Sequence, residues 1–367
     1  MNYIFLDTNI FYNNWFLTNA NFNLLFNFIE NTDSTLLMSE LVCEEVENIY
    51  QRECQSIINT LIQEKKKLEK MVQNPIDVDF ETLMPEKYDF KSLLEEKCSN
   101  IEYIPYDAIE QNVVVKRALK NIRPFQDEEK GYRDTLIWLS FLRYLLAHNI
   151  QTADVYFITN NKDDFFNKKK DAFHQHLLDD IEQANLKCII YPIDSLYGFI
   201  TGYKIEFDDH GISKTKLYED HLNEMDDEFE AELLFYINNL DQDKFKSIIE
   251  RNRLRNFPYI QTIIDHKVEL IEGVEDPEIL HYKALTPKKT YVGFRYNLRI
   301  CAIWFSIPTT EYYANKANID KYYYEIKSDE NLTTFCNYVR VFADTSFEYD
   351  MEAEELIGFD VNSIYFK

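Results

Sequence analysis

Two short, continuous apolar segments constrain this chain more than any other feature of its sequence. They cover residues 3–6 and 155–159, and polar residues follow each of them at once. Continuous apolar runs of this length are typical of strands that are buried on both faces in a parallel sheet. Between them, residues 132–148 are apolar around most of a helical surface, which predicts a buried helix. This alternation predicts an α/β fold in which helices cover both faces of a parallel sheet.

The alternation extends over the first 200 residues, with a less regular segment in its middle. A long helix is expected after Ser39, which is a suitable N-cap, and Pro75 would stop it. The segment around residues 65–125 resembles an insertion. The other expected elements are helices at 11–17, 23–30, 171–184 and 195–200, and strands at 35–38 and 187–193.

The character of the sequence changes after Gly202. From Tyr291 onward apolar and polar residues alternate, which predicts a half-buried antiparallel strand. We therefore expect two domains, an α/β domain over residues 1–204 and a smaller α+β domain with antiparallel strands over residues 205–367. The other elements expected in the second domain are helices at 214–240 and 241–254 and strands near 321–327 and 335–343.

The charge of the chain limits its classes of partner. The formal net charge is -25, which is the opposite of the basic surface of a general nucleic-acid binder. A protein with this charge that handles a polyanion needs a divalent metal or a local basic patch. The cysteines are scattered without a Cys-x-x-Cys pair, and no segment is apolar enough to span a membrane. We expect a soluble, cytoplasmic protein without a membrane partner, and a second copy of the chain or a protein regulator are candidate partners.

Asp7 lies at the carboxyl end of the first expected strand. In parallel sheets, ligands bind at this edge, and a partly buried carboxylate needs a cation or a hydrogen-bond donor. Asp7 is therefore a candidate site residue. The alternative is that it caps the helix that follows, since Asp, Thr and Asn all cap helices well.

The helix after Ser39 carries four glutamates, and helical geometry separates them. With about 100° per residue, the apolar residues of this segment define one half of the helical surface. Glu45 lies inside that half, one turn from Leu41 and one turn from Ile49. A glutamate on a buried stripe needs a partner, so Glu45 is the candidate. The other three project from the opposite half: Glu40, Glu44 and Glu47.

Two further segments supply carboxylates. Asp134 lies in the first turn of the buried helix on its inward face, although an Asp suits a helix N-terminus in any case. Asp163 and Asp164 follow the second strand, at the same sheet edge as Asp7. Converging carboxylates repel one another unless cations are present, and oxygen ligands suit Mg²⁺ or Mn²⁺. The set predicts a metal-dependent phosphodiesterase site.

Four segments of the chain resemble the acidic blocks of PIN-domain ribonucleases. The resemblance covers residues 1–200 and is closest to larger bacterial PIN-like proteins with a long insertion between the second and third blocks. It implies a three-layer α/β/α sandwich around a parallel sheet, and cleavage of RNA that depends on Mg²⁺ or Mn²⁺. Carried over block by block, the acidic positions fall on Asp7, Glu45 and Asp134. The four segments are residues 4–9, 39–46, 131–138 and 157–165.

The fourth block departs from the commoner pattern of this family. Many members place an Asp two residues after the Thr that closes the strand, and this chain has Asn161 there. We expect Asp164 to supply the catalytic and metal-binding carboxylate instead, with Asn161 binding through its amide oxygen or a water. This departure weakens the prediction of a second metal ion more than that of the first. By the same resemblance, Thr8, Asn9 and Thr159 contact the phosphate or support the metal ligands.

The acidic residues predict a metal-dependent phosphodiesterase, and the resemblance implies an endoribonuclease that leaves a 5′-phosphate and a 3′-hydroxyl and has a toxin or defence role. RNA is the expected substrate, ahead of DNA. Two alternatives stay open: a PIN-like scaffold with weak catalysis that binds RNA or protein, and a structure-specific DNA nuclease.

Three other groups of side chains have a functional and a structural interpretation. Residues 168–170 are three lysines, which either contact a nucleic-acid backbone or form a solvated surface. Arg295 and Arg299 share the polar face of the alternating strand, where they bind RNA or a partner or simply face water. His174 and His176 are expected to point apart on a helix and so not to share a metal ion.

Overall fold

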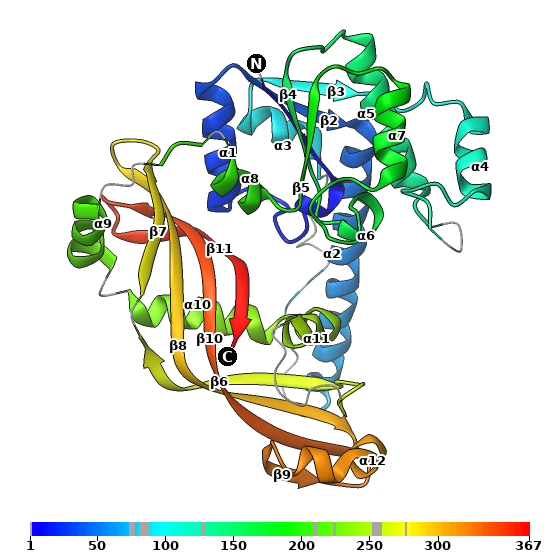
Figure 1. Ribbon diagram of the computed structural model, residues 1–367. Helices are drawn as coiled ribbons and strands as arrows, with labels where there is room; N and C mark the ends of the chain where they lie inside the picture. Colours follow the sequence, from blue (N-terminus) through cyan, green and yellow to red (C-terminus); the bar gives the residue numbers. More distant parts are fainter. Residues whose placement is uncertain are drawn as a thin grey trace. The chain divides into compact units, whose positions relative to one another are not determined.

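Figure 1 shows the computed structural model of the chain. It divides into two compact units: unit 1 consists of Met1–Thr18 and Phe22–Ile205, and unit 2 of Asn19–Asn21 and Glu206–Lys367. Pro75, the expected stop of the long helix, lies outside the described residues. The structure describes residues 2–72, 78, 80, 88–126, 130–203, 205–207, 211–222, 225–251, 259–275 and 277–367.

Unit 1 is built on a five-stranded, all-parallel sheet with the strand order β3-β2-β1-β4-β5. The two central strands are the apolar segments of the sequence, and their register pairs Phe5 with Phe157 and Leu6 with Ile158. All four of these side chains are fully buried, as expected for strands covered on both faces. The strands are β1 (Asn2–Leu6), β2 (Ser34–Ser39), β3 (Ile101–Ile104), β4 (Asp154–Ile158) and β5 (Ile189–Ile193).

Helices flank this sheet on both sides, which confirms the expected α/β/α class (Figure 1). Helix α5 packs on the central strands through aromatic rings: the ring centroids of Phe141 and Phe5 are 5.1 Å apart, and those of Trp138 and Phe157 are 5.5 Å apart. Trp138 is fully buried, which anchors the helix that carries Asp134. The helices are α1 (Ala20–Asn31), α2 (Glu40–Glu69), α3 (Phe90–Lys97), α4 (Gln111–Leu119), α5 (Tyr132–Ala147), α6 (Lys162–Phe165), α7 (Gln175–Gln183) and α8 (Leu196–Gly202).

One expectation about unit 1 was wrong, and one strand of its sheet was not anticipated. The helix expected at residues 11–17 is a 3₁₀ turn, Thr8–Ile10, followed by irregular chain in which Asn13 and Leu17 have φ values of 63° and 54°. Left-handed residues such as these interrupt a right-handed helix. In addition, β3 pairs with β2 at the edge of the sheet, although it lies within the segment that resembled an insertion. A four-residue edge strand with one fully buried side chain gives little signal in a sequence.

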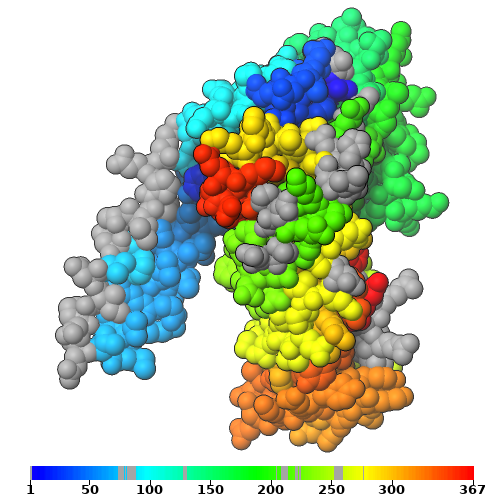
Figure 2. All heavy atoms as spheres, turned by 90° about the vertical axis from the view of Figure 1, so that its left-hand side faces the viewer, coloured from blue at the N-terminus to red at the C-terminus, as the bar shows by residue number. Residues whose placement is uncertain are grey.

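The distal half of α2 extends away from the sheet of unit 1 (Figures 1 and 2). Figure 2 shows it on the surface in blue. Among residues 51–72, Ile58 alone is buried. The half of α2 that matters for the site is therefore its buried beginning, which packs on β2 and α5.

Gly131, which precedes α5, is expected to tolerate no side chain. Its φ is +95°, and a Cβ atom there would collide with the backbone carbonyl of Pro124. We expect Gly131→Ala to lower the stability of unit 1 by about 2–4 kcal/mol, because the strain of the left-handed backbone adds to the steric collision of the new Cβ atom. The melting temperature of unit 1 should then fall by about 5–10 °C in calorimetry. Gly202→Ala is the matched control, since nothing lies within 4 Å of its Cβ position. An equal effect of both variants would contradict this prediction.

Unit 2 contains a six-stranded antiparallel sheet in which β11, β10, β8 and β6 are neighbours, β7 pairs with β8, and β9 pairs with β10. The antiparallel strand predicted from Tyr291 is confirmed as β8, but it is buried on both faces along much of its length rather than half-buried. Its arginines Arg295 and Arg299 pair with Asp344 and Glu272, at 2.7 Å and 3.2 Å. The elements are α9 (Gly211–Leu217), the π-helix η4 (Tyr218–Leu222), α10 (Asp226–Asn238), α11 (Gln242–Arg251), α12 (Thr309–Ile319), β6 (Asp265–Val274), β7 (Glu278–Ala284), β8 (Lys289–Pro308), β9 (Tyr324–Ser328), β10 (Leu332–Asp350) and β11 (Glu355–Phe366).

The acidic stretch that was expected to form one helix over residues 214–240 is broken into α9, η4 and α10. Three strands of this sheet were not anticipated, namely β6, β7 and β11. No helix within the described part of the chain is both long and apolar enough to cross a membrane.

Candidate active site

Asp7 lies at the carboxyl end of β1, beside the end of β4, and is 1% exposed. Its Oδ1 atom accepts a hydrogen bond from the Thr8 backbone N–H at 2.8 Å. Its Oδ2 atom accepts from Thr159 Oγ1 at 2.6 Å and from Asn9 Nδ2 at 2.9 Å. Burial raises the pKa of Asp7 to about 6, although these hydrogen bonds act in the opposite direction. Asp7 therefore caps the 3₁₀ turn and also presents a desolvated carboxylate, so that both interpretations of this residue apply.

Glu45 comes from the buried beginning of α2, and its side chain is 12% exposed. The hydroxyl of Thr8 donates to Glu45 Oε2 at 2.8 Å, which links Glu45 to the residue that follows Asp7. The guanidinium of Arg133 forms an ion pair with the same carboxylate. The other glutamates of this helix have different partners: Glu40 pairs with Lys91, Glu44 accepts from Tyr106, and Glu47 accepts from the Phe90 backbone.

Asp134 lies in the first turn of α5, as expected. Burial raises the pKa of its carboxyl group to about 8, and the negative charges of Asp7, Asp164 and Glu45 add to this shift, while Arg133 opposes it. No hydrogen bond to this carboxylate is found within the described residues. The four carboxylates are thus close enough to interact electrostatically, and we call Asp7, Glu45, Asp134 and Asp164 the acidic cluster.

A family model described as the PIN domain matches residues 4–165 of the chain, a range that contains the whole acidic cluster, most of β1 and the strands β2 to β4. Residues 4–165 form a PIN domain. PIN domains are generally metal-dependent nucleases. A search of curated proteins found no protein similar to this chain, and a search of solved structures found no similar structure.

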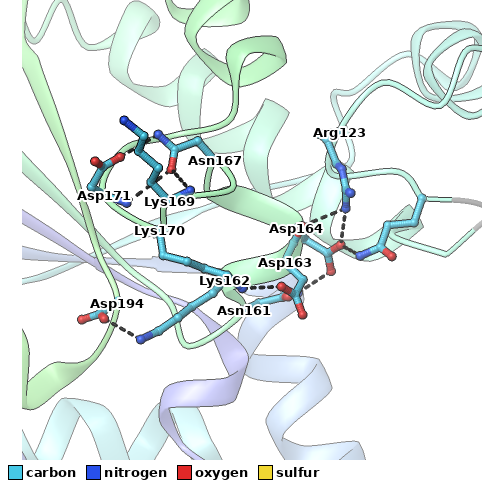
Figure 3. Close-up of polar contacts among 11 residues, drawn as sticks. Arg123, Asn161, Lys162, Asp163, Asp164, Asn167, Lys169, Lys170, Asp171 and Asp194 are labelled. Carbon is cyan, nitrogen blue, oxygen red and sulfur yellow. Dashed lines mark hydrogen bonds and ion pairs between the residues drawn. The ribbon is translucent and has the colours of Figure 1, made fainter. Parts of the chain in front are cut away.

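The fourth acidic block of the PIN domain is held by polar contacts (Figure 3). Asn161 Nδ2 donates to Asp164 Oδ2 at 2.6 Å. Arg123 Nη1 lies 3.3 Å from Asp164 Oδ1 and donates to the Asp163 carbonyl at 2.8 Å, while Gln126 also donates to Asp164. The side chain of Asp164 is 13% exposed and that of Asp163 is 83% exposed. Burial raises the pKa of Asp164, against the influence of Asn161 and Arg123. Asp164 rather than Asp163 thus belongs to the acidic cluster.

The remaining predicted residues tie the ends of β1 and β4 together. Thr159 Oγ1 accepts from the Asn161 backbone N–H at 3.0 Å and from Asn9 Nδ2 at 3.2 Å. Asn9 Oδ1 in turn accepts from the Asn160 backbone N–H at 2.8 Å. These bonds hold the carboxylate of Asp7 in one orientation. In this structure, Thr8, Asn9 and Thr159 act on the acidic cluster through hydrogen bonds to its members.

The acidic cluster has the donor chemistry for Mg²⁺ or Mn²⁺, since it offers carboxylate oxygens only. Among the residues that the structure describes, however, no three His, Cys, Asp or Glu side chains are arranged to hold a metal ion. The donor chemistry suits a metal ion but the arrangement of the described side chains does not. Two arginines explain part of this, because Arg133 pairs with Glu45 and Arg123 pairs with Asp164. Within the described part of the chain Asp134 has no such partner, and burial together with the neighbouring carboxylates raises its pKa.

Sequence reasoning missed both arginines. Arg133 stands directly before Asp134 in the third acidic block, so its position next to a candidate ligand was an available signal. Arg123 lies in the segment that resembled an insertion, and no local pattern indicates that it reaches Asp164. Only the folded chain brings it there.

The lysines at residues 168–170 lie in a tight loop between Phe166 and Phe173, which form an isolated β-bridge. The loop is closed by Asn167, whose Oδ1 accepts from the Lys169 backbone N–H at 3.0 Å (Figure 3). Lys170 pairs with Asp163, and Lys168 and Lys169 are exposed. Contact of these lysines with a nucleic-acid backbone stays a prediction.

The two histidines next to this loop do not point apart, contrary to the expectation. His174 is the N-cap of α7 rather than a helical residue, and its ring centroid lies 4.6 Å from that of His176. The Nδ1 atom of His174 accepts from the His176 backbone N–H, and the Nδ1 atom of His176 accepts from the Arg123 backbone N–H, at 3.2 Å and 3.1 Å. Both rings therefore serve to hold backbone in place.

Proposed function

We propose that this chain is a metal-dependent endoribonuclease whose active site is the acidic cluster. The observation that carries this proposal is that carboxylates from four separate segments are gathered in a buried place, where burial and mutual repulsion raise the pKa of Asp134. Such a set is costly in a metal-free protein, and a divalent cation relieves the cost. The PIN domain, whose members are generally metal-dependent nucleases, supports the same conclusion.

In this proposal Asp7, Glu45 and Asp134 hold one Mg²⁺ or Mn²⁺ ion. When bound, a divalent cation supplies positive charge to the scissile phosphate and lowers the pKa of water. Thr8 donates to both Asp7 and Glu45 and so fixes these two carboxylates relative to one another. Asp164, which is held at both oxygens, orients the attacking water.

The chemistry is hydrolysis of a phosphodiester bond. The water oxygen bonds to phosphorus, the bond from phosphorus to the 3′-oxygen breaks, and this oxygen takes up a proton. The products are a 5′-phosphate and a 3′-hydroxyl. Unit 2 is proposed to select the substrate, to regulate cleavage or to mediate self-association, and a toxin or defence role stays a prediction from the resemblance alone.

A PIN-domain scaffold that binds RNA or protein with weak catalysis is the second candidate function. The ion pairs of Glu45 with Arg133 and of Asp164 with Arg123 favour it, because they compensate two carboxylates without a metal. Incubation of the full chain with Mn²⁺ and single-stranded RNA, single-stranded DNA or flap DNA separates the candidates. We expect cleavage of RNA with 5′-phosphate ends. Preferred cleavage of flap DNA would identify a DNA nuclease, and RNA binding without cleavage would identify the scaffold.

Replacement of Glu45 tests the choice among the glutamates of α2. We expect Glu45→Gln to lower Mn²⁺-dependent RNA cleavage at least about tenfold, because it removes a charged oxygen from the acidic cluster. The matched control is Glu44→Gln, one residue away on the exposed face of the same helix, which should leave the rate within about twofold. Initial rates on a labelled RNA measure both. Equal rates for the two variants would remove Glu45 from the site.

A further inference from the structure

Donors occupy both oxygens of the Asp164 carboxylate, and one of these donors is the guanidinium of a partly buried arginine. Oδ1 faces the guanidinium of Arg123 at 3.3 Å and also accepts from Gln126, and Oδ2 accepts from Asn161 at 2.6 Å (Figure 3). One of these partners carries a full positive charge. A carboxylate with a charged partner and further hydrogen bonds has its desolvation cost compensated within the protein.

The backbone of Arg123 is itself fixed from two sides. Its N–H donates to His176 Nδ1 at 3.1 Å, and its carbonyl accepts from the guanidinium of Arg117. Arg117 forms an ion pair with Asp180 at 2.7 Å, with the two side chains 8% and 14% exposed. Asp180 also accepts from Trp138 Nε1 at 2.9 Å. Through these contacts the core beneath α5 holds the segment that presents Arg123 to Asp164.

Arg133, the second arginine that pairs with the acidic cluster, is held less firmly than Arg123. The side chain of Arg133 is 62% exposed where it pairs with Glu45, whereas that of Arg123 is 30% exposed. Arg123 Nη1 has an additional bond to the Asp163 carbonyl at 2.8 Å. An exposed arginine with one ion pair gives up its carboxylate at little cost, because water replaces the lost contact. Arg123 is partly buried and anchored, so separating it from its carboxylate is costly.

We propose that the guanidinium of Arg123 takes the place of a second metal ion, so that the acidic cluster binds a single divalent cation through Asp7, Glu45 and Asp134. This inference rests on the proposed function and specifies it. Arg123 is a positioning residue: it neutralises Asp164 and holds this carboxylate toward the water rather than toward a second ion. When the metal ion binds, it replaces Arg133 as the partner of Glu45, and this completes the single site.

The number of Mn²⁺ ions bound per chain tests this proposal. Isothermal titration of the full chain is carried out at an ionic strength that suppresses weak binding to the acidic surface. We expect one ion for the wild type and two for Arg123→Gln, because the freed Asp164 becomes available as a ligand. Arg123→Lys keeps the positive charge and should keep one ion. Arg143→Gln is the matched control, since Arg143 also donates to a backbone carbonyl, that of Ala108, but is exposed on α5.

Each other outcome has a defined meaning. Two ions bound by the wild type, or one ion bound by a folded Arg123→Gln variant, would overturn the role of Arg123 and leave the metal-dependent function intact. If Arg123→Gln does not fold, Arg123→Lys decides, since two ions bound by this charge-retaining variant would overturn the proposal. Binding of no ion by the wild type would overturn the proposed function itself.

Discussion

Asp7→Asn is expected to abolish Mn²⁺-dependent RNA cleavage, with a loss of at least about 1,000-fold, while the protein stays folded. The carboxylate of Asp7 is 1% exposed and is oriented by three hydrogen bonds, so no neighbouring side chain can substitute for its charge. An amide of the same shape keeps an acceptor for Thr159 and Asn9. It also removes a charge that burial disfavours, as the raised pKa of Asp7 shows. We therefore expect folding to survive where catalysis does not.

The measurement is the initial rate of cleavage of a labelled RNA, with circular dichroism to confirm the fold. Asp163→Asn is the matched control, since the Asp163 side chain is 83% exposed in the same region and pairs only with Lys170 among the contacts described. Its rate should stay within about twofold of the wild type. Undiminished cleavage by a folded Asp7→Asn variant would rule out the acidic cluster as the active site.

The second expectation concerns stability rather than rate: Asp134→Asn should stabilise the metal-free protein. The pKa of Asp134 is raised from 3.8 in the unfolded chain to about 8 in the folded one. Above pH 4 the unfolded chain therefore binds fewer protons than the folded chain, and the folded state loses stability as the pH rises toward 8. Each pH unit in this window costs at most about 1.4 kcal/mol. The amide side chain of the Asp134→Asn variant is neutral at every pH, so the variant does not lose this stability.

In EDTA at pH 8, the melting temperature of unit 1 in Asp134→Asn should exceed that of the wild type by roughly 5 °C or more, and the gain should shrink at pH 5. Mn²⁺ should reverse the order, because a cation stabilises the wild-type cluster and finds one ligand fewer in the variant. Scanning calorimetry at the two pH values, with EDTA or with Mn²⁺, measures both effects. A wild type that is the more stable protein in EDTA at pH 8 would show that Asp134 is not strained by its neighbours.

Local patterns were sufficient for the elements that carry the acidic cluster. Strands β1 and β4 were predicted because they are buried on both faces and so are apolar throughout, and α5 because most of its surface is buried. Glu45 could be chosen from its position on the apolar half of α2, and its side chain is 12% exposed, against 37% for Glu40. In each case the burial that orders the element also shaped its sequence.

Elements defined by a distant partner escaped prediction. Strand β3 is recognisable only by its pairing with β2, and β6 and β11 only by their pairing with β8 and β10. The contact of Arg123 with Asp164 joins residues 41 positions apart, and its anchor joins Arg117 to Asp180, 63 positions apart. No local propensity encodes such contacts, because they depend on the final placement of helices around the sheet.

Taken by itself, the sequence determined that a parallel sheet forms and that carboxylates follow two of its strands, because burial on both faces produces continuous apolar runs that can be recognised locally. The tertiary structure alone decided how each carboxylate is compensated. Asp7 is held by hydrogen bonds, Glu45 and Asp164 are each paired with an arginine, and Asp134 has a pKa raised to about 8. The physical reason is that charge compensation acts over a few ångströms in space, regardless of distance along the chain.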